Sequence, residues 1–282
     1  MEQNQKPLST GARLNIFLLR IARNWMRVVL VFIGVYAVLP WVAPVLMQTG
    51  AESAGRAIYT LYTPMCHQMA FRSFFLFGDQ YAYPLAGSGT HLEPFEAYAG
   101  RSLILNDFAD NRVPQPPFNV RGLPEFTGLN IGDDVQPTPG VLPEAANFAR
   151  LQLANKPFNG NEIMGYKTAL CERDLAIYAA IFFAGLIYSR PYVRRRVRPV
   201  PLLLYLFLGV LPIALDGGSQ LLSYPPLELW PARETLPIFR VVTGALFGFM
   251  TAWLGFPYVE MSMQDTRREI EAKLIAAGIW TK

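Results

Sequence analysis

Long apolar segments alternate with polar stretches along the 282-residue chain. The apolar segments cover residues 28–47, 175–189, 200–215 and 236–259. A transmembrane helix needs about 20 apolar residues, so the second segment spans a bilayer only if it extends back through residues 168–174. The pattern predicts four membrane-spanning helices. A pair of buried helices in a soluble core is the alternative for the second and third segments.

Lysine and arginine gather in three short flanks: before the first apolar segment, between the second and third, and after the fourth. Such flanks stay in the cytoplasm. All three can do so only if the number of spans is even and both termini are inside, and four spans meet this condition. We therefore expect a multi-pass protein of the cell membrane with both termini cytoplasmic. A cleavable signal peptide is the alternative for the first segment, although its basic lead is long for one.

The expected fold is an all-α membrane protein, a four-helix transmembrane bundle with a largely irregular extracytoplasmic insertion. The expected units are a cytoplasmic amphipathic segment (1–27), the first span (28–47), an extracytoplasmic segment (48–170), three further spans within 171–259 and a cytoplasmic helix (260–282). The insertion is the Pro- and Gly-rich part of the third unit, about residues 79–164, with a short helix expected at 143–156. Pro40 and Pro44 are expected to bend the first span.

Composition agrees with a bilayer as the main partner, because 52% of the residues are hydrophobic and the net charge is only +4. The chain has no basic patch interleaved with aromatic residues and no Gly-rich phosphate loop. We therefore expect no nucleic-acid binding. The insertion is expected to contact protein partners.

The predicted topology places the uncommon polar residues at one level, the outer ends of the spans. They are Cys66, His67, Gln68 and Arg72 in the outer segment, Cys171, Arg173 and Asp174 where the second span begins, Asp216 and Gln220 where the third ends, and Arg240 near the outer end of the fourth. His91, the second of two histidines, is expected to be a loop residue without a role.

Asp216 and Arg240 each need a partner of opposite charge. A carboxylate is disfavoured at a helix C-terminus, and an arginine is costly in lipid unless it is paired. We expect Asp216 to pair with Arg240 in a structural clamp between the third and fourth spans, with Arg173 or a metal as the alternatives.

The two cysteines leave three interpretations open. A Cys66–Cys171 disulfide suits an extracytoplasmic location. A zinc or copper site could instead use Cys66, His67, Cys171 and Asp174. Cys171 and Asp174 share a helix face at an N-terminus, which favours thiolate and carboxylate. Buried thiols without a role are the third interpretation.

Four motifs, "CHQMAFRSFFLFG", "CERDLAIY", "LPIALDGGSQ" and "RVVTGALFG", resemble in this order a prokaryotic family of small integral membrane proteins, domain of unknown function 2085. The matching residues are Cys66, His67, Gln68, Arg72, Ser73, Cys171, Arg173, Asp216, Gly217, Gln220, Arg240, Thr243 and Gly244. The resemblance covers about residues 59–78 and 165–248. It implies the membrane fold and no established reaction.

Two departures from the family pattern bear on the cysteines. About eighty residues separate the first two motifs here, where the family has a short link, and Asp174 replaces the second cysteine of Cys-x-Arg-Cys. The family pattern of three cysteines and one histidine implies a tetrahedral metal site. With Asp174 that site becomes a mixed, more open set, or is lost in favour of a disulfide.

The favoured function is a structural or binding subunit of a membrane assembly. One alternative is a membrane enzyme for a lipid-linked or periplasmic substrate, with Asp216, Arg240, His67 and Arg173 around its site. An arginine beside carboxylates would position a phosphate there. The other is a metal or thiol-redox protein, which lacks the usual Cys-x-x-Cys. A transporter has less support, since no inverted repeat is found.

Overall fold

The structure is a computed structural model of the chain. It describes residues 9–85, 88, 90–95, 158–223, 227, 229–230 and 233–279. Most of the insertion, including the helix expected at 143–156, lies outside the described residues.

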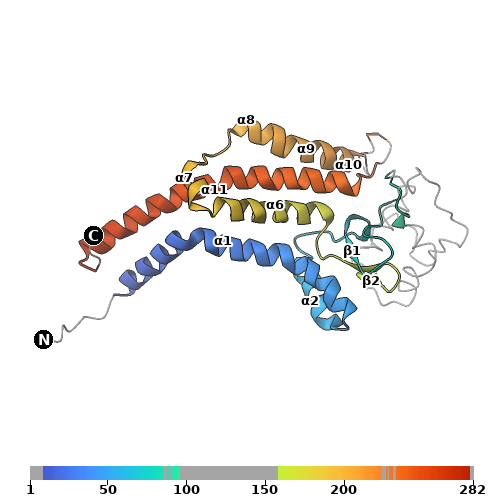
Figure 1. Ribbon diagram of the computed structural model, residues 1–282, viewed down its shortest axis with the longest axis horizontal. Coiled ribbons are helices and arrows are strands. Elements are labelled where there is room, and N and C mark those ends of the chain that lie inside the picture. The colour runs from blue at the N-terminus through green and yellow to red at the C-terminus, as the bar shows by residue number, and fades with distance from the viewer. Residues whose placement is uncertain are drawn as a thin grey trace, which may run out of the picture.

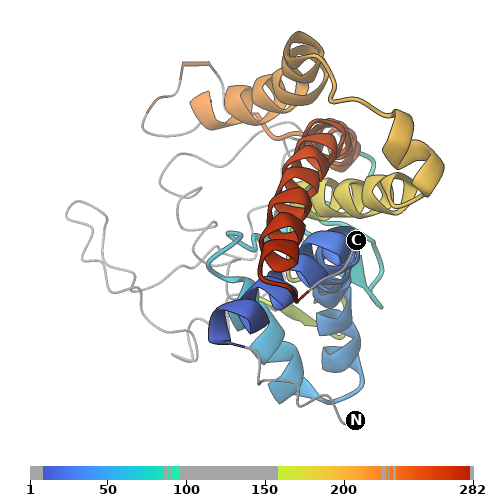
Figure 2. The ribbon, with the colours of Figure 1, turned by 90° about the vertical axis from the view of Figure 1, so that its left-hand side faces the viewer.

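Helices run side by side along the long axis of the molecule (Figure 1). They are α1 (Thr10–Gln48), α6 (Glu172–Tyr188), α11 (Pro237–Ala276) and a composite helix, Leu202–Leu222. The composite helix consists of α8 (Leu202–Leu204), η3 (Tyr205–Val210), α9 (Leu211–Ile213), η4 (Ala214–Gly218) and α10 (Ser219–Leu222), of which η3 and η4 are π-helical. In the end-on view it forms an outer layer against α11, with α1 on the other side of the bundle (Figure 2).

Three of these helices are long and apolar enough to cross a membrane: α1, the composite helix and α11. Their outward faces carry large apolar side chains, such as Phe32 at 73% exposure and Leu203 at 69%, which only lipid or a partner would cover. Helix α6 has 17 residues, or about 26 Å at 1.5 Å per residue, slightly less than the hydrocarbon thickness of a bilayer. A mostly helical protein with three candidate spans is therefore established, and a fourth span in α6 stays a prediction.

Helix α1 continues through both of its prolines to Gln48. Each proline lacks an N–H and so leaves the carbonyl four residues earlier without its helical partner. Both carbonyls find other donors: the Tyr62 hydroxyl binds Tyr36 O at 2.8 Å, and the Ala169 N–H binds Pro40 O at 3.2 Å. The carbonyls that the two prolines leave free thus attach the outer segment to α1.

The outer segment is not wholly irregular at its described ends. It contains α2 (Glu52–Tyr62), the 3₁₀ turn η1 (Ala70–Arg72) and a small antiparallel sheet in the order β1-β3-β2. Strand β1 (Phe75–Leu76) pairs with β3 (Gly165–Lys167), which pairs with β2 (Gly160–Asn161). The insertion thus leaves and re-enters the fold on neighbouring strands, which explains how the bundle accommodates a long insertion.

These ends also have a core of their own, which the expectation of a largely irregular insertion did not include. Its largest side chains are Phe71, Phe75, Tyr83, Phe95 and Phe158. The rings of Phe75 and Tyr83 meet edge to face, with centroids 4.9 Å apart. The sheet and this core form a small cap, hereafter the sheet end, opposite the chain termini (Figure 1).

Candidate functional site

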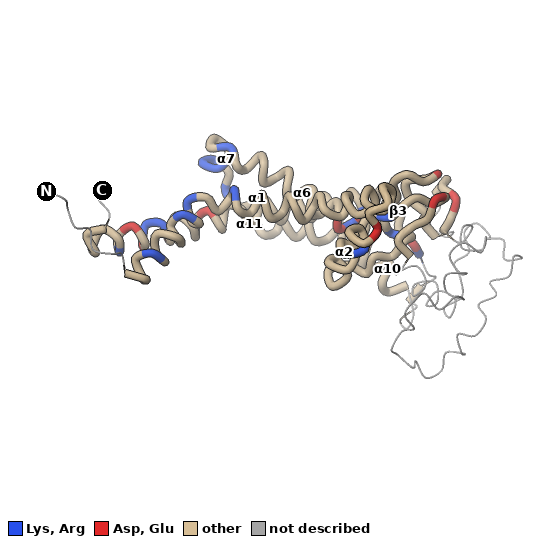
Figure 3. The backbone as a smooth tube through the Cα atoms, turned by 90° about the horizontal axis from the view of Figure 1, so that it is seen from below, with Lys and Arg blue, Asp and Glu red and all other residues tan. Residues whose placement is uncertain are grey.

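Charged side chains mark the two ends of the bundle and are rare between them (Figure 3). The sheet end holds most of the polar residues singled out in the sequence. Helices α6 and α11 meet there closely because Gly244 and Gly248 carry no side chain. A Cβ on Gly244 would lie 2.6 Å from Arg173 O, and one on Gly248 would lie 2.3 Å from Ile177 O. Small residues four apart are typical of close helix pairs in membranes.

Arg240 lies in a buried ion network at this end, with only 2% of its surface exposed. Its guanidinium donates to Glu172 Oε2 at 3.4 Å, to Phe71 O at 3.4 Å and to the Glu234 carboxylate. Arg72 binds the same Glu234 through two nitrogens, at 3.0 and 3.3 Å. Two guanidiniums therefore face two carboxylates, and the network is neutral as a whole.

The prediction that Asp216 pairs with Arg240 is wrong. Asp216 pairs instead with Arg173, one of the alternatives, and more distantly with Arg233 at 3.8 Å. The Thr243 hydroxyl lies 3.5 Å from Asp216 Oδ2, so the carboxylate still joins the composite helix to α6 and α11. Gly217 permits this arrangement, since a Cβ there would lie 2.8 Å from an Arg173 nitrogen.

Cys66, Cys171 and Asp174 come together although they lie on two distant parts of the chain. Their possible ligand atoms are all within 4.8 Å of one another. The Cys171 thiol donates to Asp174 Oδ2 at 3.1 Å, and both cysteines are free thiols. Two thiols and a carboxylate form a donor set for a thiophilic metal.

Gln68 determines where Cys66 points. It is buried and has a φ of 52°, a left-handed conformation uncommon outside glycine. Its side-chain amide donates to Tyr59 O at 2.7 Å and to Ala169 O at 3.1 Å, and its backbone N–H lies 3.4 Å from Cys66 Sγ. This turn directs Cys66 inward and leaves His67 exposed and outside the group.

The remaining expected residues lie nearby or apart. Gln220 is buried with 3% exposure, near Asp216 in the same composite helix. His91 is exposed in an irregular segment.

Three buried charged residues in the described part of the sheet end are absent from the sequence-based set: Lys167, Glu172 and Glu234. Lys167 is fully buried and donates to Gln68 O at 2.5 Å. Glu172, which directly follows Cys171, could have been found from the sequence, because an arginine inside an apolar helix requires a carboxylate partner. Lys167 and Glu234 lie in non-helical segments, where spacing along the sequence does not indicate burial.

Comparison with known proteins places the bundle in a family context. Residues 155–254 match the family of domain of unknown function 2085, described as a predicted membrane protein. This match confirms the resemblance that the motifs indicate. The matched residues of this chain include Cys171, Asp174, Asp216 and Arg240, and they begin after the Cys66 motif.

A relative of this chain is an uncharacterised protein of Methanocaldococcus jannaschii. It is 29% identical over 96 residues, which are 34% of this chain and 55% of that protein. The chain thus spans about half the length of the curated relative it matches. No solved structure matches the chain.

Proposed function

We propose that this chain is a non-enzymatic binding protein of the membrane, whose sheet end holds a thiophilic metal ion between Cys66, Cys171 and Asp174. The observation that carries the proposal is the convergence of these three ligand atoms within 4.8 Å. Each comes from an element that the fold holds in place: Cys66 through the Gln68 turn, and the other two through the start of α6.

The donor set fits zinc better than copper. Tetrahedral zinc with thiolates at about 2.3 Å places two sulfurs about 3.8 Å apart, a separation compatible with the observed group. Copper(I) prefers sulfur ligands alone, whereas Asp174 supplies oxygen. Three protein ligands are typical of zinc sites that keep a fourth position open, and that position would be available to a partner or a small ligand.

A membrane enzyme acting on a phosphate has less support. Arg72, Arg173 and Arg240 all direct their guanidiniums at carboxylates of the chain itself. Each would have to leave a buried partner before it could hold a substrate. Their closed pairing favours a structural role for these arginines beside a separate binding site.

Metal analysis of the purified full chain tests the proposal. We expect about one zinc per chain, with both thiols titratable after chelation and denaturation without reductant. Cys66→Ser and Cys171→Ser should each abolish binding, and Asp174→Asn should weaken it about tenfold or more. Asp265→Asn is the matched control, because the Asp265 side chain is 77% exposed and, among the described residues, its ion pair is with Arg268.

Two outcomes would contradict the proposal. Recovery of a Cys66–Cys171 disulfide and no metal would favour the redox interpretation. Metal that persists in Cys66→Ser would place the ligand set elsewhere. Removal of the exposed imidazole in His67→Ala should leave binding unchanged.

We further propose that the protein acts as a subunit of a membrane assembly, with partners reached through the insertion. The support is the composite helix, which packs mainly on α11 and keeps an apolar outer surface. Deletion of residues 96–157 should release a partner that co-purifies in mild detergent. A wild-type chain that elutes alone as a monomer would argue against the assembly.

A further inference from the structure

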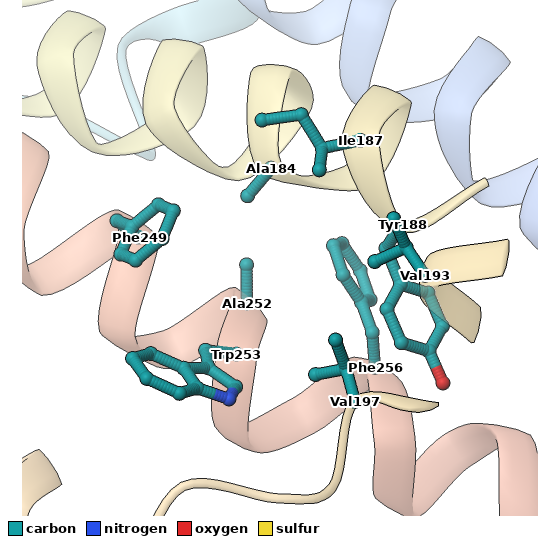
Figure 4. Close-up of a pocket in the computed structure, with 9 residues that line it drawn as sticks. All are labelled: Ala184, Ile187, Tyr188, Val193, Val197, Phe249, Ala252, Trp253 and Phe256. Atoms are coloured by element: carbon teal, nitrogen blue, oxygen red, sulfur yellow. The ribbon is translucent and has the colours of Figure 1, made fainter. Parts of the chain in front are cut away.

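A hollow lies near the end of the bundle opposite the sheet end, where α6, α7 (Pro191–Arg196) and α11 meet. Figure 4 shows the side chains around it. Its volume is about 230 Å³. The lining residues are Ala184, Ile187, Tyr188, Val193, Val197, Phe249, Ala252, Trp253 and Phe256. We call this hollow the α7 groove; apart from the edge groups of Tyr188 and Trp253, its walls are hydrocarbon.

Basic residues directly neighbour two of the apolar residues that line the groove. Val193 and Val197 line the groove, and Arg194, Arg195 and Arg196 lie between them in the sequence. Arg194 is held by Glu260. Arg195 and Arg196, by contrast, are exposed and make no ion pair with any residue that the structure describes.

Two more exposed arginines flank the same helix, Arg190 before it and Arg198 after it. Trp253 Nε1 donates to Arg198 O at 3.1 Å, and the Arg196 guanidinium lies 4.1 Å from the ring centre of the exposed Tyr192. Aromatic and basic side chains in this combination are typical of the boundary between hydrocarbon and headgroups. The groove therefore lies at the depth where an acyl chain joins its headgroup.

We propose that the α7 groove binds one acyl chain of an anionic phospholipid, with the phosphate held by Arg195 and Arg196. The volume of the groove favours a single acyl chain over a larger ligand, because pockets for whole drug-sized molecules measure about 300–1,000 Å³. Charge favours an anionic headgroup. Four exposed arginines, Arg190, Arg195, Arg196 and Arg198, lie in or beside α7 without an ion pair to a described residue, and the carboxylate of Glu260 is paired with Arg194 and Arg267.

Fluorescence of Trp253, which lines the groove, tests the proposal. The full chain is reconstituted in vesicles of phosphatidylcholine containing increasing fractions of phosphatidylglycerol with brominated acyl chains, which quench tryptophan on contact. The Trp253 signal is taken as the difference from Trp253→Phe. We expect saturable quenching by brominated phosphatidylglycerol, and half-saturation at a several-fold higher fraction for brominated phosphatidylcholine.

Arg195→Gln/Arg196→Gln should weaken phosphatidylglycerol binding on the order of tenfold or more, because each surface arginine contributes about fivefold. The control Arg268→Gln/Lys273→Gln removes two exposed charges from α11 and should change little. Equal quenching by the two lipids, or equal effects of the two double variants, would overturn the proposal and leave only general lipid contact.

Filling the groove tests how much the acyl chain contributes to lipid binding, separately from the charge of the headgroup. Ala184→Phe should abolish saturable quenching with all arginines in place, whereas Leu186→Phe, on the exposed side of α6, should preserve it. Val197→Phe repeats the test from α7 if Ala184→Phe does not fold. Saturable quenching that survives both groove variants would exclude the groove as the site.

Discussion

Arg240 of α11 and Glu172 of α6 lie side by side at the sheet end, joined from Nη1 to Oε2 at 3.4 Å, with 2% and 0% of their surfaces exposed. Arg72 and Glu234 complete the network from two non-adjacent parts of the outer segments. Buried charges of this kind are stable only as a balanced set. The four residues therefore act as one unit that fixes the sheet end to α6 and α11.

Removal of one member of this ion network should lower the stability of the protein. Arg240→Met leaves Glu172 and Glu234 with a single remaining guanidinium, that of Arg72. We expect the free energy of unfolding to fall by about 3–5 kcal/mol, measured by chemical unfolding in mixed micelles.

Neutralising a charge of each sign should recover part of that loss, so Arg240→Met/Glu172→Gln is expected to be more stable than Arg240→Met alone. The exposed control Arg268→Gln should stay within about 0.5 kcal/mol of wild type. A single variant as stable as wild type would mean that the network is not buried in the membrane-bound protein.

The close contact between α6 and α11 gives a second prediction. Gly248→Ala would place a methyl group 2.3 Å from Ile177 O, so the two helices must separate. Gly255→Ala in the same helix meets nothing within 4 Å and should be neutral or stabilising by up to about 1 kcal/mol. Thermal unfolding in detergent should lower the midpoint of the first variant only. Equal midpoints would mean that the helices are not held at this distance.

The apolar segments were sufficient to predict the long helices but not their ends. The first segment, residues 28–47, occupies about half of α1, because the basic residues before it continue the same helical hydrogen bonding. Pro40 and Pro44 do not end the helix, since a tyrosine hydroxyl and an alanine N–H take up the freed carbonyls. Both donors are remote in sequence, which hydropathy does not reveal.

The sequence was sufficient to predict where the candidate site lies, but not which of its charged residues pair with each other. Hydropathy indicates that Asp216 and Arg240 lie near helix ends, but it does not determine how the helices are rotated about their axes. Arg240 consequently pairs with Glu172 and Glu234, the latter in an irregular segment. Gln68 illustrates a similar limit: its motif marks it, yet its left-handed turn is visible only in the structure.

Gln68 gives a third prediction, about the turn that holds Cys66. Gln68→Ala loses both amide hydrogen bonds and keeps the strained φ, so we expect a loss of about 1–3 kcal/mol and faster alkylation of Cys66. Phe77→Gly is the contrasting control, because Phe77 also has a positive φ but is 54% exposed; it should retain wild-type alkylation. Unchanged alkylation in Gln68→Ala would mean that another contact orients Cys66.

The fourth span is the remaining question of topology, and single-cysteine labelling addresses it. In a Cys66→Ser/Cys171→Ser background, Asp79→Cys at the sheet end should react with a membrane-impermeant maleimide in intact cells. Arg195→Cys in α7 and Arg268→Cys in α11 should react only after permeabilisation, because both residues belong to basic flanks that we expect in the cytoplasm. The result depends on α6, whose 17 residues have to carry the chain across between the first two positions. Reaction of Asp79→Cys and Arg195→Cys from the same side would show that α6 does not cross, and the four-span arrangement would then be wrong.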